Sequence, residues 1–401
     1  MFEKAFEPIA RDLREAQEVF RAFQGFDGLA APSKTARPTA AGKPRSVYEQ
    51  MAVEIAGRPG KWMRPGLFLL ATRAAAGDGP SACRPGAGLP RKHLLVAAAL
   101  EMVQNASLLH DDVLDGAALR RHRATANARW GNRAAVLFGD FLIATAFQLV
   151  TEAEMPRAFP ALASILSSLC SGEILQETLG ASPLRVTAED ALKVATRKTA
   201  SFVAEVCGLG FAGGGGPHAA IEALRRYGLH FGLAYQIMDD VVDIVGVEKK
   251  EGKTLRTDLV LARPTLALAY LLQRAPEKAR RLVPPCGEAA VAELAALMVR
   301  TGAVSCAMAE AETNLSRAKA ALAKAAALTP DRLHGLEEAF GALLDALAER
   351  RRSLAAVGAT ASPSGLVGGP SRSANNCRAG RPAYNVRPRL KPPIRPRSGR
   401  P

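Results

Sequence analysis

Apolar residues recur at helical spacing along most of this chain, whereas the strict alternation of half-buried strands is scarce. Alanine and leucine, both strong helix formers, dominate these stretches. We therefore predict an all-α protein with few or no strands. After an amphipathic helix at the N-terminus, helices are predicted over residues 46–56, 64–76, 93–115, 132–152, 161–179, 188–210, 218–246 and 264–274, with others within 288–356.

Stretches rich in glycine and proline separate these helices and suggest three regions. Residues 1–47 are predicted to hold the N-terminal helix and a connector over 25–43. Residues 48–357 then form the main helical domain. Residues 358–401, rich in Pro, Arg, Gly and Ser, lack apolar periodicity and are predicted to be disordered.

The net charge of +15 is concentrated in that tail, which carries eight arginines and Lys391 but no acidic residue. We interpret the tail as a solvated extension, with peripheral contact to an acidic membrane surface as the alternative. A nucleic-acid partner would rest on this charge alone, because aromatic stacking residues and a recognition motif are missing. No nucleic-acid partner is predicted.

Six scattered cysteines without a CxxC pair favour neither a zinc site nor a disulfide framework, and they fit a reducing compartment. The N-terminus lacks the apolar core of a secretory signal. The longest apolar span, Ala134 to Val150, contains Asp140 and is expected to fall short of a membrane helix. These features predict a soluble, cytoplasmic protein.

Two aspartate motifs, DDVLD at 111–115 and DDVVD at 239–243, are the main candidates for chemistry. The first and last aspartates of each lie four residues apart, on one face of a helix. One such motif could be a solvated acidic face, but two within apolar helices indicate bound cations. Carboxylates without His or Cys partners select a hard ion such as Mg²⁺, which usually shares its ligands with substrate phosphates.

Basic residues flank both motifs and could bind the remaining phosphate oxygens. Lys61 and Arg64 occur at a helix start, where backbone N–H groups also favour anions. Each basic residue alone is most often a surface charge. Together, they predict a diphosphate substrate.

In its ordered set of motifs, the segment from Tyr48 to Arg351 resembles the trans-isoprenyl diphosphate synthases, especially the long-chain polyprenyl type. The family pattern GKxxRP matches residues 60–65, and the HDDxxD block matches residues 110–115. The remaining matches are the arginine turn at 120–125, Gly139-Asp140, GExxQ at 172–176, Lys198-Thr199, and Gln236 before the second DDxxD.

This resemblance implies the isoprenoid synthase fold, a helical bundle around a central active-site cavity, with residues 48–357 as the catalytic domain. It also implies head-to-tail (1'-4) condensation of isopentenyl diphosphate with an allylic diphosphate. Magnesium, three ions in the family, assists ionisation of the allylic diphosphate to a carbocation, which the double bond of isopentenyl diphosphate then captures. A homodimer is also implied.

The resemblance assigns a role to each matching residue. The diphosphate of isopentenyl diphosphate would be bound by Lys61, Arg64, Gln104 and Arg121, and the allylic diphosphate by Arg120, Lys198 and Lys253. Magnesium would be bound by Asp111, Asp115 and Asp239, with the shell completed by Asp112, Asp240 and Asp243. Thr199 and Gln236 would face the allylic cation. The expected catalytic residues are Asp111, Asp115, Arg120, Lys198, Thr199, Gln236 and Asp239.

Small residues precede the first motif at positions that control product length in this family. Ala106 and Ser107 leave the predicted tunnel open, with Val103 and Leu100 as candidates for its floor. The resemblance then implies a linear all-trans product longer than farnesyl (C15) diphosphate. The competing interpretation is that small residues merely permit close helix packing.

Four positions depart from the family pattern. His122 and Arg256 replace glycine, Ala124 replaces proline, and Gln104 replaces a frequent histidine. A local backbone difference is therefore expected in the turn at 120–125. Two alternative functions share the fold: a class I terpene cyclase and a non-catalytic subunit of a heteromeric prenyl synthase. Both aspartate motifs are intact, which favours chain elongation.

Overall fold

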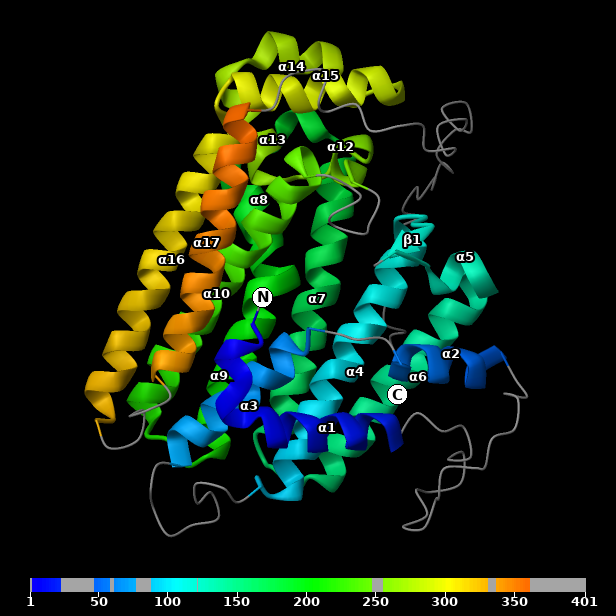
Figure 1. Cartoon of the computed structure of the whole chain (residues 1–401). Helices are drawn as coiled ribbons and strands as arrows, with labels where there is room; N and C mark the ends of the chain where they lie inside the picture. Colours follow the sequence, from blue (N-terminus) through cyan, green and yellow to red (C-terminus); the bar gives the residue numbers. More distant parts are fainter. Residues whose placement is uncertain are drawn as a thin grey trace, which may run out of the picture.

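The computed structural model shows a helical bundle, which confirms the predicted fold class (Figure 1). Its only strands among the described residues are β1 (Leu119–Arg120) and β2 (Arg123–Ala124), which pair as a minimal antiparallel hairpin. The described residues are 2–22, 47–57, 61–76, 88–120, 122–246, 255–330 and 337–360. The predicted connector and most of the predicted tail therefore lie outside them.

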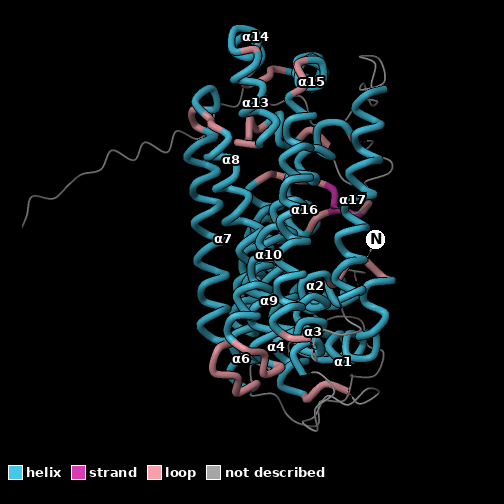
Figure 2. Tube along the Cα trace, turned by 90° about the vertical axis from the view of Figure 1, so that its left-hand side faces the viewer, coloured by secondary structure: helices cyan, strands magenta, loops and turns pink. Residues whose placement is uncertain are grey.

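The helix that carries the second aspartate motif, α10 (His218–Val245), runs through the middle of the bundle (Figures 1 and 2). It packs along α16 (Ala303–Leu328) and α9 (Ser201–Gly213), and α9 in turn packs on α3 (Met63–Ala76). Apolar residues surround α10 on nearly all sides, as expected of a buried helix.

The first motif ends α4 (Arg91–Leu114), which packs along α6 (Asn132–Glu152). The next long helix is α7 (Ala158–Gly180). The acidic ends of α4 and α10 lie near the same end of the bundle, beside the hairpin and α12 (Thr257–Val260) (Figure 1). Three helices thus converge where the predicted chemistry lies.

The N-terminal segment belongs to the same hydrophobic core. It forms η1 (Lys4–Ile9) and α1 (Ala10–Ala22). Phe2 packs against the rings of Phe231 and Tyr235 of α10, and the buried carboxylate of Asp12 pairs with Arg73 of α3 at 2.8 Å. This segment therefore supports the helices that form the site.

The remaining elements refine the predicted boundaries. The helix predicted over 188–210 consists of α8 (Ala188–Ala195), a π-helical turn η4 (Thr196–Ala200) and α9. The region 288–356 resolves into α15 (Gly287–Arg300), α16 and α17 (Glu337–Thr360). The other elements are α2 (Val47–Gly57), α5 (Ala126–Trp130), η3 (Pro183–Arg185), α13 (Leu266–Arg274) and α14 (Pro276–Leu282).

One prediction about membrane helices needs correction. The span from Ala134 to Val150 belongs to the 21-residue helix α6, and both α6 and the 23-residue α7 are long and apolar enough to cross a membrane. The bent pair α15 and α16 would add a third if counted as one span. The sequence-based prediction gave too much weight to Asp140, because one aspartate does not offset the apolar residues in the rest of α6. This finding concerns length and composition alone.

Candidate active site

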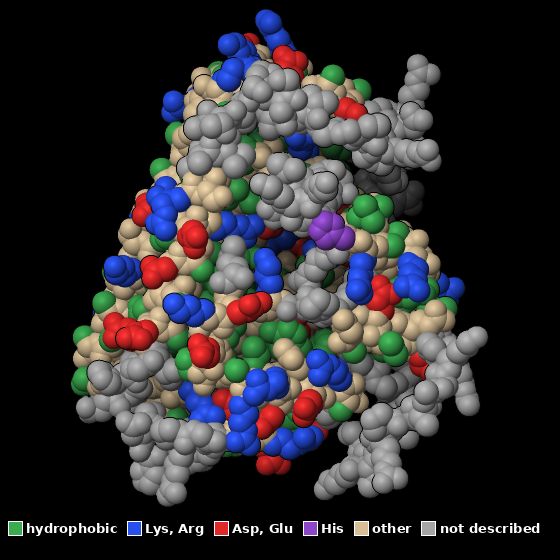
Figure 3. Space-filling view, viewed as in Figure 1, with side chains coloured by type: hydrophobic (Ala, Val, Ile, Leu, Met, Phe, Trp, Pro, Cys, Tyr) green, Lys and Arg blue, Asp and Glu red, His purple; other side chains and the backbone are tan. Residues whose placement is uncertain are grey.

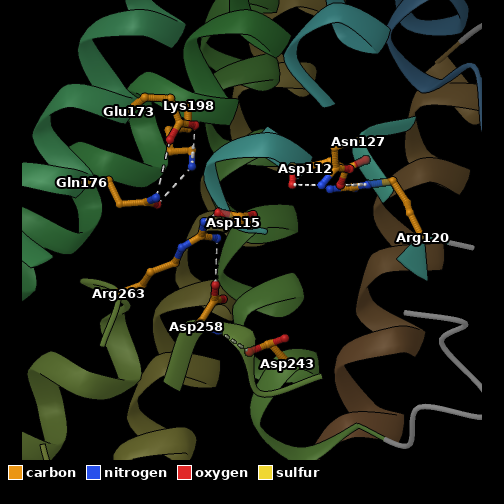
Figure 4. Close-up of polar contacts among 10 residues, drawn as sticks. All are labelled: Asp112, Asp115, Arg120, Asn127, Glu173, Gln176, Lys198, Asp243, Asp258 and Arg263. Atoms are coloured by element: carbon orange, nitrogen blue, oxygen red, sulfur yellow. Dashed lines mark hydrogen bonds and ion pairs between the residues drawn. The ribbon is translucent and has the colours of Figure 1, made fainter. Parts of the chain in front are cut away.

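The first aspartate motif contacts the segment after the second through Arg263 (Figure 4). The Arg263 guanidinium pairs with Asp115 and, at 3.1 Å, with Asp258 of α12. Burial lowers the pKa of Arg263, while the nearby Asp111 carboxylate raises it. Arg263 therefore balances carboxylates from two distant parts of the chain.

Asp112 points away from Asp115, toward the hairpin (Figure 4). Its buried carboxylate accepts a hydrogen bond of 2.7 Å from Arg120 Nε, and its backbone carbonyl accepts one from Asn127 Nδ2 at 3.0 Å. These contacts anchor β1 to the end of α4. Asp112 and Arg120, which the resemblance assigned to metal and allylic diphosphate, are thus paired with each other here.

In the second motif, each aspartate has a different partner. Asp239 lies 3.6 Å from Arg350 Nη2 of α17. The Asp240 carboxylate accepts a 2.7 Å hydrogen bond from Gln236 Nε2, and burial raises its pKa well above the ordinary value. The buried Asp243 carboxylate accepts a hydrogen bond from the Asp258 backbone N–H at 3.0 Å. Asp243 therefore holds the start of α12 in place.

Thr199 and Gln236 lie together, as the resemblance implies. Thr199 Oγ1 donates a 2.6 Å hydrogen bond to Gln236 Oε1, so the amide nitrogen of Gln236 is free to donate to Asp240. Thr199 occupies the π-helical turn η4, next to Lys198. Such turns occur frequently at functional sites, because they redirect side chains within a helix.

The carboxylates have the chemistry for magnesium but do not form a closed cage. Among the described residues, no group of three His, Cys, Asp or Glu side chains converges closely enough to hold an ion. A hard cation that takes its other ligands from substrate phosphates needs only one or two carboxylates. The oxygen-only donor set of Asp111, Asp115 and Asp239 fits that mode of binding.

Arg64 provides a half-buried positive charge near the same site. Its guanidinium lies 4.7 Å from the centre of the Phe202 ring, and its Nε has no hydrogen-bond partner in the described part of the chain. Burial lowers the pKa of Arg64, partly offset by Tyr235 and the carboxylates of Glu101 and Asp111. A partly buried cation of this kind favours an anionic ligand.

The other predicted phosphate ligands are less enclosed. Lys61 is exposed and Gln104 half-buried. Arg121 and Lys253 lie outside the described residues. Figure 3 shows Lys, Arg, Asp and Glu side chains gathered around a hollow in the middle of the face shown. Charges of both signs thus lie near this hollow on the face shown.

The proposed chain-length residues lie along α4 below Asp111. Leu100, Val103 and Ala106 are buried in the core, whereas Ser107 is half-buried and donates a 2.9 Å hydrogen bond to the Gln104 carbonyl. The side chain at position 107 is therefore a small one.

Two of the departures from the family pattern lie at strained backbone positions. His122 has φ of 61° and Arg256 has φ of 64°, in the left-handed region that glycine adopts most easily. At these two residues, the backbone keeps a conformation suited to glycine despite the larger side chains. The cost is conformational strain of about 1–2 kcal/mol per residue.

Sequence reasoning assigned no role to Arg263, Asp258, Arg350 or Glu173, although all four contact the motif residues or Lys198. GExxQ was visible as a pattern. The other three carry no local signal, because their contacts join segments far apart in sequence.

This arrangement of helices and charges is that of a prenyltransferase, and comparison with known proteins identifies the family. Residues 45–298 match the polyprenyl synthetase family, and the chain belongs to it. It is 37% identical over 254 residues to heptaprenyl diphosphate synthase component 2 of Geobacillus stearothermophilus, covering 62% of this chain and 74% of the relative. A short chain isoprenyl diphosphate synthase of Methanothermobacter thermautotrophicus is 36% identical, covering 65% and 79%.

A solved structure matches a larger share of this chain than these two relatives do. The polyprenyl synthase of Caulobacter crescentus, complexed with calcium and isoprenyl diphosphate, superposes with a TM-score of 0.73 and 28% identity. The match covers 87% of this chain and 98% of that one. Enzymes of this family use a divalent metal, with isopentenyl diphosphate and an allylic diphosphate as substrates.

Proposed function

We propose that this enzyme condenses isopentenyl diphosphate with an allylic diphosphate, head to tail, to give a linear all-trans polyprenyl diphosphate longer than C15. The observation that carries the proposal is the meeting of two aspartate motifs at one end of the bundle, among the cations Arg64, Lys198 and Arg263. Carboxylates and cations in alternation suit a metal-bound diphosphate.

Magnesium, in three ions, would be held by Asp111, Asp115 and Asp239, and would neutralise charge on the departing diphosphate. The protein supplies the remaining positive charge. Lys198 and Arg263 now pair with carboxylates, and their other N–H groups can donate to phosphate oxygens. Bond breaking at the allylic carbon then releases a diphosphate whose charge is already balanced.

Arg64 would orient isopentenyl diphosphate, with Lys61 and Gln104 nearer the surface. Thr199 and Asp240 fix the Gln236 side chain, which would face the allylic cation in a constant orientation. The double bond attacks that carbon, and the proton lost in the second step passes to the released diphosphate. Apolar helices around the site keep water from quenching the cation.

A second copy of the chain would cover the apolar face of α6 and α7. Leu137 is 46% exposed on α6, and Phe159 and Ile174 are 53% and 68% exposed on α7. An exposed apolar surface of this kind usually marks an interface. We favour a cytoplasmic homodimer. The name of the Geobacillus relative, component 2, makes a heteromeric partner the second candidate.

The direct test uses purified protein, Mg²⁺, labelled isopentenyl diphosphate and a series of allylic primers, with products separated by chain length. Elongated products beyond C15 support the proposal. A C15 product would remove the long-chain assignment, and an absence of elongation with every primer would refute the reaction. Light scattering of the same protein gives its oligomeric state.

A further inference from the structure

Glu173 of α7 lies beside the site but outside both aspartate motifs (Figure 4). Its Oε1 is 2.5 Å from Lys198 Nζ, and its Oε2 lies 3.5 Å from Gln176 Nε2. Lys198 Nζ also donates to Gln176 Oε1 at 3.0 Å. The three side chains thus form a closed network in which Lys198 has two fixed acceptors.

Two backbone features bring Lys198 to this network. A Cβ atom at Gly172 would lie 2.8 Å from Lys198 Cγ and 3.0 Å from its backbone nitrogen, so glycine permits the close approach of α7 and η4. The π-helical turn of η4 contains Lys198 itself. Both features help to place the ammonium group of Lys198.

Glu173 also interacts electrostatically with Asp111 of the first aspartate motif. Burial raises the pKa of Glu173, Lys198 lowers it, and repulsion from the Asp111 carboxylate raises it further. Two facing carboxylates favour a cation near both of them. If Glu173 served only as the counterion of Lys198, its position near Asp111 would have no explanation.

We propose that Glu173 is a positioning residue that fixes Lys198 for the allylic diphosphate and strengthens binding of the metal–diphosphate unit beside Asp111. This inference rests on the proposed function of the site. Glu173 need not be a direct ligand, because residues that orient or electrostatically support ligands commonly change metal affinity about 10–100-fold.

The test compares Glu173→Gln with Glu205→Gln. Glu205 is a matched control, since it is also partly buried and paired with an arginine, Arg225, in a different part of the bundle. Calorimetry would measure binding of Mg²⁺ with inorganic diphosphate. We expect about tenfold weaker binding for Glu173→Gln and no change for Glu205→Gln. KM should rise for the allylic substrate and stay constant for isopentenyl diphosphate.

Glu173→Asp provides a second variant, which keeps the charge but shortens the side chain. It should recover most of the metal–diphosphate affinity. Provided that the wild-type protein is active, the inference would be overturned by unchanged metal–diphosphate binding in Glu173→Gln or by an equal rise in both KM values. If the wild-type protein itself neither binds the probe nor elongates a primer, the proposed function has failed instead.

Discussion

Arg263 and Asp115 form an ion pair that joins the segment after the second aspartate motif to the first motif. The pair closes the site across helices that are distant in sequence. It also places a guanidinium on a carboxylate expected to bind metal, so metal binding and this ion pair are in competition.

Arg263→Ala should lower kcat/KM about 100-fold, because a cation near the departing diphosphate is lost. It should also destabilise the metal-free protein by about 1–3 kcal/mol, since Asp115 and Asp258 then lose their ion pairs with the guanidinium. Thermal unfolding with and without Mg²⁺ and diphosphate would separate the two effects. Wild-type activity in this variant would show that Arg263 serves packing only.

Asp111→Ala and Asp239→Ala should each lower turnover by about two orders of magnitude or more while the protein remains folded. Steady-state rates and circular dichroism are the measurements. Asp345→Ala is a suitable control, as Asp345 is exposed on α17. Full activity in either motif variant would show that the metal assignment is wrong.

His122→Gly and Arg256→Gly should each stabilise the protein by about 0.5–1 kcal/mol. Relief of the left-handed strain outweighs the greater chain entropy of glycine in the unfolded state. Glu154→Gly is a comparator far from the motifs, because Glu154 also has a positive φ of 49°. Urea unfolding measures all three, and a loss of stability in every variant would contradict the strain argument.

Glu205 should make stability depend on pH. Burial raises its folded pKa above the unfolded value, so the folded protein binds the proton more tightly. Its contribution is therefore fully present below the unfolded glutamate pKa and is lost as pH rises through the folded pKa. Denaturation at several pH values should show that the free energy of unfolding declines less with rising pH in Glu205→Gln than in the wild-type protein. Identical slopes of this free energy against pH in the two proteins would exclude Glu205 as the source.

Ile174→Arg should weaken the proposed dimer, since it replaces an exposed apolar residue of α7 with a charge. Leu328→Arg is a control at an exposed apolar residue at the end of α16. Sedimentation velocity should show monomer for the first variant and dimer for the second. Dimers of equal strength in both would place the interface elsewhere.

The sequence by itself determined the helical class, the approximate bounds of the long helices before residue 288 and the residues of both motifs. Helical periodicity and the DDxxD spacing are local properties, so they can be read without tertiary information. The replacement of glycine by His122 and Arg256 was visible in the sequence, but the strain was not predicted, because a changed turn was expected at His122 and both residues have a positive φ instead.

The tertiary structure alone decided which charges meet. Asp112 turned out to face Arg120, whereas Asp115 faces Arg263, although the two aspartates are only three residues apart at the end of α4. Helix packing sets these partners, and packing depends on side chains from the whole chain. The π-helical turn at Lys198 likewise has no local pattern, since its close fit against Gly172 arises only when α7 and η4 come together.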